Sequence, residues 1–193
     1  MSEVKNILLV GVGGQGTILA SKILSEGLLG AGYDVKMSEI HGMSQRGGSV
    51  STQIRYGEKV FSPIIGEGEA DILVSFETME AARYIRFIKP GAKVVINDYR
   101  IFSPEVLSGA FTYPDTTIAD ISAAADVTVI DASRLAAKAG STKAMNIVLL
   151  GALIEGLGMS GIDWNTIIAG LVKPAFVELN QKALKIGMEA MKK

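Results

Sequence analysis

Two stretches of the chain combine residue types and spacing that could bind a ligand. The first is the glycine turn, which follows an apolar run and consists of Gly11, Val12, Gly13, Gly14, Gln15 and Gly16. It matches the G-x-G-x-x-G pattern, in which backbone N–H groups at the start of a helix bind a phosphate. Glu39 follows near the end of the next expected strand, where a dinucleotide site holds an acid for a ribose hydroxyl. The alternative interpretation is that the glycines only allow a tight turn and close helix packing.

The second stretch is the segment from His41 to Ser49, which we call the 41–49 loop. It contains the only histidine of the chain and places hydroxyl, amide and guanidinium donors between glycines. Such donors suit a phosphate, a carboxylate or a partner surface. The alternative is a solvated connection in which the histidine has no role. The candidate binding residues in this loop are His41, Ser44, Gln45, Arg46, Gly47 and Gly48.

Other chemistry is sparse in this sequence. With one histidine and no cysteine, a zinc site would need unusual ligands, and no G-x-S-x-G nucleophile elbow is present. The lack of cysteine also excludes a thiolate nucleophile, a disulfide framework and a cysteine-ligated iron–sulfur cluster. We therefore expect no catalytic residue and no metal site on this chain.

Composition narrows the class of protein. A chain of 193 residues that is 48% hydrophobic and 20% charged predicts one globular domain with its own core. The net charge of −1 gives no electrostatic basis for binding nucleic acid or an anionic membrane. The richest apolar run, 147–157, is too short and too interrupted for a membrane span. Because we identify no signal peptide before the first strand, we expect a cytoplasmic location.

The order of expected elements predicts an α/β fold. A strand, the glycine turn, a helix and a second strand form a Rossmann-like βαβ unit. A β-hairpin of strands 49–55 and 59–61 is expected where a dinucleotide domain would continue with another crossover helix. That substitution argues against a complete dinucleotide site. The expected strands are 6–10, 33–38, 49–55, 59–61, 70–76, 93–97 and 126–130, and the expected helices are 15–29, 78–88 (closed by 89–91) and 133–139.

The last fifty residues predict helices broken near Gly158 and Pro174, so that a helical segment runs from about 142 to 193. The apolar stretch 142–157 is apolar on more than one face, which predicts deep burial or contact with a partner and favours burial. Together these patterns predict a single domain, 1–193, built as a three-layer α/β/α sandwich. Its sheet should be mixed but mostly parallel, with the hairpin supplying the antiparallel strands.

Several segments resemble the small subunit of 2-oxoacid:ferredoxin oxidoreductases, which is called the gamma subunit or gamma domain. The resemblance covers nearly the whole chain and is most specific in the 41–49 loop. Separate chains in this family fit the indolepyruvate type best, in which this piece is the beta subunit. The resembling segments are GVGGQG at 11–16, HGMSQRGGSV at 41–50, GEADILVSFETMEAARY at 68–84 and KAMNIVLLGAL at 143–153.

This resemblance implies a division of labour between subunits. The complex would oxidatively decarboxylate a 2-oxoacid, transfer the acyl group to coenzyme A and pass electrons to ferredoxin. Thiamine diphosphate and 4Fe–4S clusters would belong to a large partner subunit, and this chain would hold no cofactor firmly. The glycine turn would serve packing or a phosphate-bearing ligand, such as coenzyme A or a diphosphate at the subunit boundary. A dimer of heterodimers is one assembly that the resemblance suggests.

Three alternatives stay open on the sequence. The chain could be the gamma subunit of a pyruvate, 2-oxoglutarate or 2-oxoisovalerate enzyme. It could be a stand-alone nicotinamide-dependent dehydrogenase, which the glycine turn and Glu39 favour. It could also be a nucleotide-binding module without catalytic activity.

Overall fold

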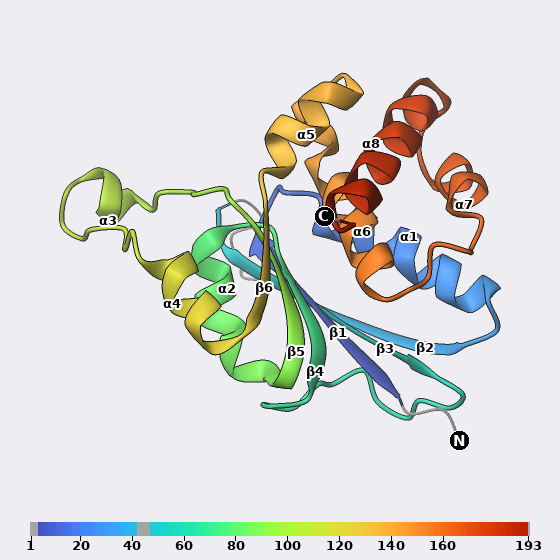
Figure 1. Ribbon diagram of the computed structural model, residues 1–193, viewed down its shortest axis with the longest axis horizontal. Coiled ribbons are helices and arrows are strands. Elements are labelled where there is room, and N and C mark those ends of the chain that lie inside the picture. Colours follow the sequence, from blue (N-terminus) through green and yellow to red (C-terminus); the bar gives the residue numbers. More distant parts are fainter. Residues whose placement is uncertain (1–3, 42–46, 193) are drawn as a thin grey trace.

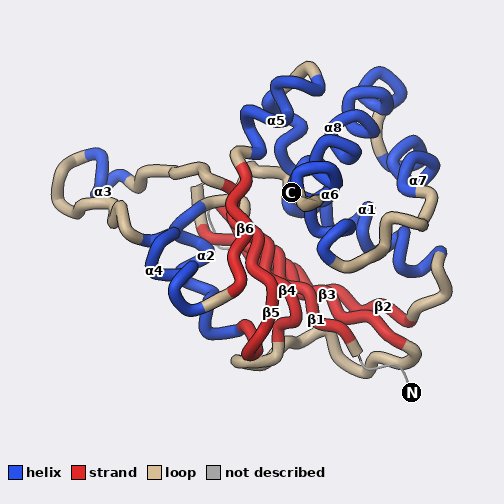
Figure 2. The backbone as a smooth tube through the Cα atoms, viewed as in Figure 1, coloured by secondary structure: helices blue, strands red, loops and turns tan. Residues whose placement is uncertain are grey.

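The computed structural model describes residues 4–41 and 47–192 and shows a six-stranded sheet with helices on both faces (Figures 1 and 2). The strand order is β2-β3-β1-β4-β5-β6. The strands are β1 (Lys5–Val12), β2 (Asp34–His41), β3 (Ser49–Gly57), β4 (Ala70–Ser75), β5 (Ile88–Asn97) and β6 (Asp126–Ile130). The α/β sandwich predicted from the sequence is therefore confirmed.

Alternating side chains of β1 divide the core between the two faces of the sheet. Ile7 and Leu9 pack with α1 (Thr17–Gly30) and α6 (Met145–Gly156), whereas Leu8 and Val10 pack with α2 (Thr78–Tyr84) and α4 (Thr117–Ala124). The helices after β6 join the α1 side, which Figure 2 shows as the larger helical layer. They are α5 (Ala132–Ala139), α6, α7 (Trp164–Leu171) and α8 (Val177–Ala190), with 3₁₀ turns at Thr142–Ala144 and Pro174–Phe176.

Strand directions explain how the first half of the chain is arranged. β1, β4, β5 and β6 are parallel, and β3 runs antiparallel between β1 and β2. β2 therefore lies parallel to β1 but is separated from it by β3. In a dinucleotide fold with strand order 3-2-1-4-5-6, the strand beside the first one is parallel and carries the ribose-binding acid. Here an antiparallel strand occupies that place.

The hairpin prediction was wrong in its partners. β3 pairs with β2 along its whole length, from Asp34 opposite Gly57 to His41 opposite Val50, so the 41–49 loop is the hairpin connection. Residues 59–61 form no strand. Val60 N–H instead donates to the Asp34 carboxylate at 2.9 Å. This bond holds the segment after β3 beside the start of β2. Two long paired strands give β3 more ladder hydrogen bonds than a three-residue run could offer.

The predicted end of the second helix was also wrong. α2 ends at Tyr84, a 3₁₀ turn covers Ile85–Phe87, and β5 already begins at Ile88. The Lys89-Pro90-Gly91 segment, expected as a helix stop, lies inside β5 where the register with β4 shifts. Gly91 has a φ of +78°, in the left-handed region that glycine adopts without strain. Proline and glycine mark a bulge here rather than a loop.

Deep burial of α6 is confirmed, since all its residues from Asn146 to Ile154 are buried. Its neighbour α8 approaches so closely that a Cβ added to Gly187 would lie 1.9 Å from the Val148 carbonyl oxygen. This backbone-to-backbone packing fixes α6 against the sheet. The first turn of α6 is thereby held beside the glycine turn.

Candidate functional site

The glycine turn joins β1 to α1 and uses two glycines in the left-handed region, Gly14 at φ +103° and Gly16 at φ +81°. Gly16 is the N-cap of α1. A Cβ at Gly16 would lie 2.6 Å from Asn146 Nδ2, and that same nitrogen donates to the Gly16 carbonyl at 3.1 Å. The tight turn and close packing expected of the glycines are therefore present, and α6 is the helix that packs here.

Gln15 is buried and connects the ends of two strands. Its Oε1 accepts a hydrogen bond from Val12 N–H at 2.7 Å, and its Nε2 donates to the Phe76 carbonyl at 2.8 Å. A Cβ at Gly11 would lie 2.8 Å from that Oε1, so the first glycine of the motif leaves room for this amide. Of the predicted binding residues, Gln15 thus links the ends of β1 and β4, and Gly11, within β1, makes room for it.

Asn97 extends this connection across the sheet. Its Nδ2 donates to the same Phe76 carbonyl at 3.0 Å, and its Oδ1 accepts from Ala132 N–H, at the start of α5, at 3.0 Å. We call Gln15, Asn97 and the shared Phe76 carbonyl the amide bridge. β1 is followed by a helix on one face and β4 by a helix on the other. The crevice at such a switch point is where ligands bind in open α/β sheets, and here the Gln15 amide fills it.

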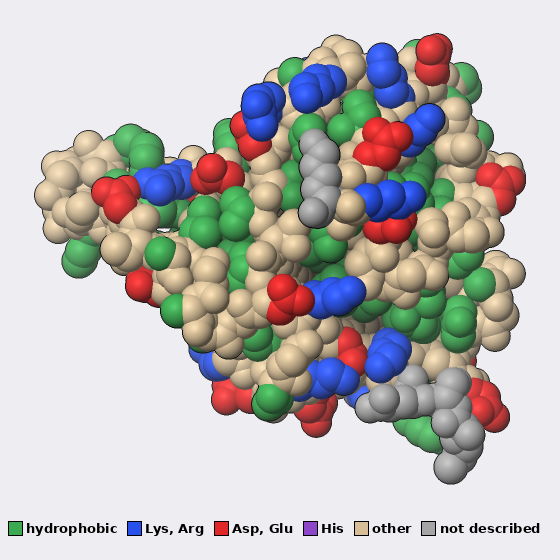
Figure 3. Space-filling view, in the orientation of Figure 1, with side chains coloured by type: hydrophobic (Ala, Val, Ile, Leu, Met, Phe, Trp, Pro, Cys, Tyr) green, Lys and Arg blue, Asp and Glu red, His purple; other side chains and the backbone are tan. Residues whose placement is uncertain are grey.

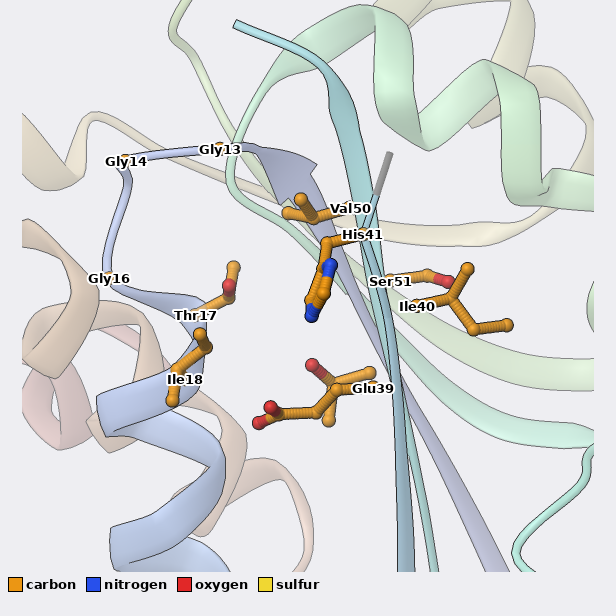
Figure 4. Close-up of a pocket in the computed structure, with 11 residues that line it drawn as sticks. Gly13, Gly14, Gly16, Thr17, Ile18, Glu39, Ile40, His41, Val50 and Ser51 are labelled. Carbon is orange, nitrogen blue, oxygen red and sulfur yellow. The ribbon is translucent and has the colours of Figure 1, made fainter. Parts of the chain in front are cut away.

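A cavity of about 410 Å³ lies beside the closed crevice, between α1 and the strands β2 and β3. We call it the α1 cavity. Figure 4 shows Thr17 and Ile18 of α1 facing Glu39 and His41 of β2 across it, while Ile40 and Ser51 point to the opposite side of the strands. The structure therefore brings three glycines of the turn and His41 into one site. The lining residues are Gly13, Gly14, Gly16, Thr17, Ile18, Glu39, Ile40, His41, Val50, Ser51 and Thr52.

The electrostatics of the α1 cavity favour an anion at one end. The N-cap Gly16 provides no side-chain hydrogen bond to α1, and the first turn of α1 holds no acid. Backbone N–H groups at an uncapped helix start, together with the helix dipole, attract phosphates and carboxylates. Glu39 lies at the other end, where its Oε1 accepts a hydrogen bond from Ser21 Oγ at 3.1 Å.

The position of Glu39 differs from that of the acid in a dinucleotide fold. Glu39 lies opposite Thr52 of β3, and Thr52 lies opposite Leu9 of β1. Two strand spacings of about 4.8 Å therefore separate Glu39 from β1, where a dinucleotide fold has one. The sequence spacing that made Glu39 a ribose ligand did not reveal the strand that intervenes.

The 41–49 loop is tied to the glycine turn at its C-terminal end. Gly13 N–H donates to the Gly48 carbonyl at 2.8 Å, and Gly47 N–H donates to the Gly13 carbonyl at 3.3 Å. His41 lines the α1 cavity at the other end of the loop. The candidates Ser44, Gln45 and Arg46 lie outside the described residues, so their assignment stays a prediction.

A second cavity, of about 530 Å³, lies on the α2 side of the same sheet edge and was not predicted. We call it the α2 cavity. Gly47 and Ser49 form one wall, α2 contributes Glu77, Met79, Glu80 and Arg83, and the far wall consists of Ile101, Phe102, Ser103, Pro104, Val106, Phe111, Thr112, Tyr113 and Pro114. The 41–49 loop thus begins at one cavity and ends at the other.

Two buried acids organise the α2 cavity, although we predicted no role for either. Glu77, the N-cap of α2, accepts from Glu80 N–H at 3.0 Å, from Ile101 N–H at 3.1 Å and from the Tyr113 hydroxyl at 2.8 Å. Burial raises the pKa of Tyr113, and the bond to Glu77 raises it further. An acid just before an expected helix start was the one local signal for this cap.

Glu80 holds the start of β3. Its carboxylate accepts a hydrogen bond from Ser49 Oγ and pairs with Arg83 Nε at 3.0 Å. Burial raises the pKa of Glu80, although Ser49 and Arg83 both act in the opposite direction. The first turn of α2 therefore anchors both the end of the 41–49 loop and the segment that follows β5.

Residues 4–41 and 47–192 contain no group of three or more His, Cys, Asp or Glu side chains that could hold a metal ion. No helix within those ranges is long and apolar enough to cross a membrane.

Comparison with known proteins shows which protein family this chain matches. The model of the family described as pyruvate ferredoxin/flavodoxin oxidoreductase matches residues 6–190. The indolepyruvate oxidoreductase subunit IorB of Archaeoglobus fulgidus is 40% identical over 187 residues, which cover 94% of this chain and 92% of that relative.

A more distant relative has a longer chain. The ketoisovalerate oxidoreductase subunit VorA of Methanothermobacter thermautotrophicus is 25% identical over 190 residues, which cover 95% of this chain but 35% of that relative. The fold itself matches the crystal structure of a keto/oxoacid ferredoxin oxidoreductase gamma subunit from Geobacter sulfurreducens. The TM-score is 0.72 at 23% identity, over 97% of this chain and 98% of that one.

Replacing Gln15 by leucine tests the amide bridge. We expect Gln15→Leu to leave the buried Val12 N–H without an acceptor, which costs about 1–3 kcal/mol and lowers Tm by roughly 2–12 °C. The matched control is Gln181→Leu, because the Gln181 amide donates to the Asn165 carbonyl at an exposed position. Scanning calorimetry measures the melting temperature of both variants. Equal melting temperatures would show that the amide bridge does not stabilise the turn.

Proposed function

The chain belongs to the pyruvate ferredoxin/flavodoxin oxidoreductase family, and from this premise we propose that it is the small subunit of an indolepyruvate-type 2-oxoacid:ferredoxin oxidoreductase. The observation that carries the proposal is the 40% identity to an indolepyruvate oxidoreductase subunit across nearly the full length of both chains. The complex would oxidatively decarboxylate the 2-oxoacid to an acyl-coenzyme A, with ferredoxin as the electron acceptor. The similarity to the ketoisovalerate relative makes ketoisovalerate the alternative 2-oxoacid substrate.

We assign thiamine diphosphate and the 4Fe–4S clusters to a larger partner chain. The 193 residues include no cysteine, so this chain cannot supply the thiolate ligands that such clusters use. The described residues also offer no metal-binding cluster of acids and histidine. The small subunit therefore contributes shape and ligand contacts, and the redox centres act elsewhere. A cytoplasmic location and a dimer of heterodimers stay predictions within this proposal.

The part of the site that this chain can supply is a phosphate contact for coenzyme A in the α1 cavity. Gly14, Gly16 and Thr17 line it at the uncapped start of α1, where backbone donors favour a phosphate. Coenzyme A brings the phosphates, and its thiol accepts the acyl group. Glu39, held by Ser21, is an acceptor for a hydroxyl group at the other end of the cavity. The separation of Glu39 from β1 by β3 argues against a nicotinamide dinucleotide in the same place.

The subunit assignment predicts that the isolated chain is catalytically inert. With indolepyruvate, coenzyme A, thiamine diphosphate and a viologen dye, the pure chain should reduce no dye above the blank. Adding the separately purified large chain should restore dye reduction with a sharp optimum at equimolar subunits. Steady reduction by the small chain alone, or an inactive mixture of two folded chains that bind each other, would contradict the assignment.

A charge placed at the start of α1 tests the phosphate contact. Ile18 lies in the first turn of α1, is half-exposed and lines the α1 cavity. An acid there suits the helix dipole, which is worth about 0.3–1 kcal/mol, so Ile18→Glu should fold. Like charges about 8 Å apart near a surface repel by roughly 2 kcal/mol, so the KM for coenzyme A should rise about thirtyfold.

The control for that experiment is Ile18→Gln, because glutamine has nearly the same shape as glutamate but carries no charge. Both variants are assayed in the reconstituted complex, beside their melting temperatures. Only the glutamate variant should raise the KM for coenzyme A. Equal KM values in the two variants would remove coenzyme A phosphate from the α1 cavity while leaving the subunit assignment intact.

A further inference from the structure

Residues 98–116, which connect β5 to α4, leave the body of the molecule as an arm (Figures 1 and 2). Its tip holds the short helix α3 (Pro104–Leu107). The base of the arm is tied down by Thr78 N–H donating to the Tyr99 carbonyl at 2.9 Å and by the two bonds that Ile101 and Tyr113 donate to Glu77. Arg100 pairs with Asp115 at 2.6 Å and closes the base of the arm on itself. The arm is therefore held in place at its base.

The tip, residues 102–112, is apolar and has its polar contacts within itself. Across the described residues, no hydrogen bond or ion pair joins the tip to the body, and Glu105 is its single charged residue. Phe102, Leu107 and Phe111 are 47%, 73% and 68% exposed. Figure 3 shows the arm as a lobe set apart from the body with hydrophobic side chains on its surface. An exposed cluster of large apolar side chains on a projecting segment is typical of an interaction site.

We propose that the tip of this arm inserts into an apolar groove of the larger subunit and anchors the two chains together. This inference rests on the proposed function and names the surface through which the small subunit joins its partner. The tip projects from the surface, so its complement must be concave. Large apolar side chains that fill a partner's pocket at the centre of an interface carry most of its binding energy.

The position of the arm favours a different chain as the partner. The arm, including tip residues such as Phe102 and Phe111, and the end of the 41–49 loop are opposite walls of the α2 cavity, so both lie at one edge of the sheet. The ketoisovalerate relative carries the same domain in a chain of which it makes up about a third. If the corresponding surface of that relative packs on another part of the same chain, the arm of this shorter chain would pack on a separate subunit.

A second copy of this chain fits the tip less well. A stable interface buries about 800 Å² per partner, and the three exposed large side chains of the tip bury at most about 250 Å² each, so two tips packed only on each other fall short, whereas a groove in a larger chain can also cover the surface around the tip. Among the described cavities, the one between α7 and α8 has a mixed lining, in which Glu178, Lys182 and Lys185 would have to be desolvated by an apolar tip. A more aliphatic cavity near Leu29 and Leu171 encloses only about 330 Å³, little room for three large side chains.

The test compares two double variants of exposed apolar residues. Leu107→Ser with Phe111→Ser alters the tip. The matched control, Phe61→Ser with Ile64→Ser, alters residues that are 90% and 55% exposed on the segment between β3 and β4, at the opposite edge of the sheet. Both variants should melt like the wild type. The tip variant should bind the large chain about thirtyfold more weakly, as loss of central apolar anchors does, and the control within about threefold.

Limited proteolysis of the wild-type chains supplies a second readout that needs no variant. Chymotrypsin should cut the isolated small subunit after Leu107 or Phe111, and assembly with the large chain should protect these bonds. The proposal would be overturned if the tip variant binds the large chain as tightly as the wild type, or if these bonds are cut at equal rates in the free and assembled states. An active wild-type complex would in that case still support the proposed function. The proposal would also be overturned if the small chain associates with itself, the tip variant abolishes this self-association, and binding to the large chain is unaffected. Failure of the wild-type chains to bind each other would instead remove the proposed function.

Discussion

The Gln15 amide joins the glycine turn to the strand beside it, and the ligand space is arranged around this contact. Its two hydrogen bonds satisfy the last N–H of β1 and the carbonyl that follows β4. Both partners are buried, so leaving either unpaired would cost more than the bond itself gains. Asn97 shares the Phe76 carbonyl and carries the connection to α5. The carboxyl edge of the sheet is therefore closed by side-chain amides.

This closure moves the space for ligands to the two sides of the switch point. On one side the uncapped start of α1 faces Glu39 and His41 across the α1 cavity. On the other side the acids at the start of α2 hold Ser49 and the arm around the α2 cavity. The 41–49 loop connects the two. The proposed coenzyme A contact would occupy the first side, and the proposed interface with a larger chain would use the second.

Patterns that depend on near neighbours in sequence could be predicted. The first βαβ unit, the buried α6 and the breaks near Gly158 and Pro174 follow from hydrophobic spacing and from glycine and proline chemistry. The strand partner of β3 was not predicted, because a local turn signal at 56–58 competed with pairing to the preceding strand, β2, across the 41–49 loop. The bulge at Gly91 looked like a helix stop for the same reason, since proline and glycine serve both.

The candidate site shows the same limit. The glycines and His41 could be identified from residue type, and the structure places three glycines of the turn and His41 in one cavity. The role of Gln15 could not, because its acceptor Phe76 lies 61 residues further along the chain. No role was predicted for Glu77 or Glu80, because their partners come from the arm and from β3. Side-chain partners that are remote in sequence carry no local pattern.

We infer that the dinucleotide-type turn of this chain serves packing and a phosphate contact and does not hold a nicotinamide cofactor. Isothermal titration of NADH and NADPH into the isolated chain distinguishes these roles. We expect no saturable heat up to about 1 mM cofactor, which corresponds to a binding free energy weaker than about −4 kcal/mol. A dissociation constant of about 10 μM or tighter, roughly −7 kcal/mol, would contradict it.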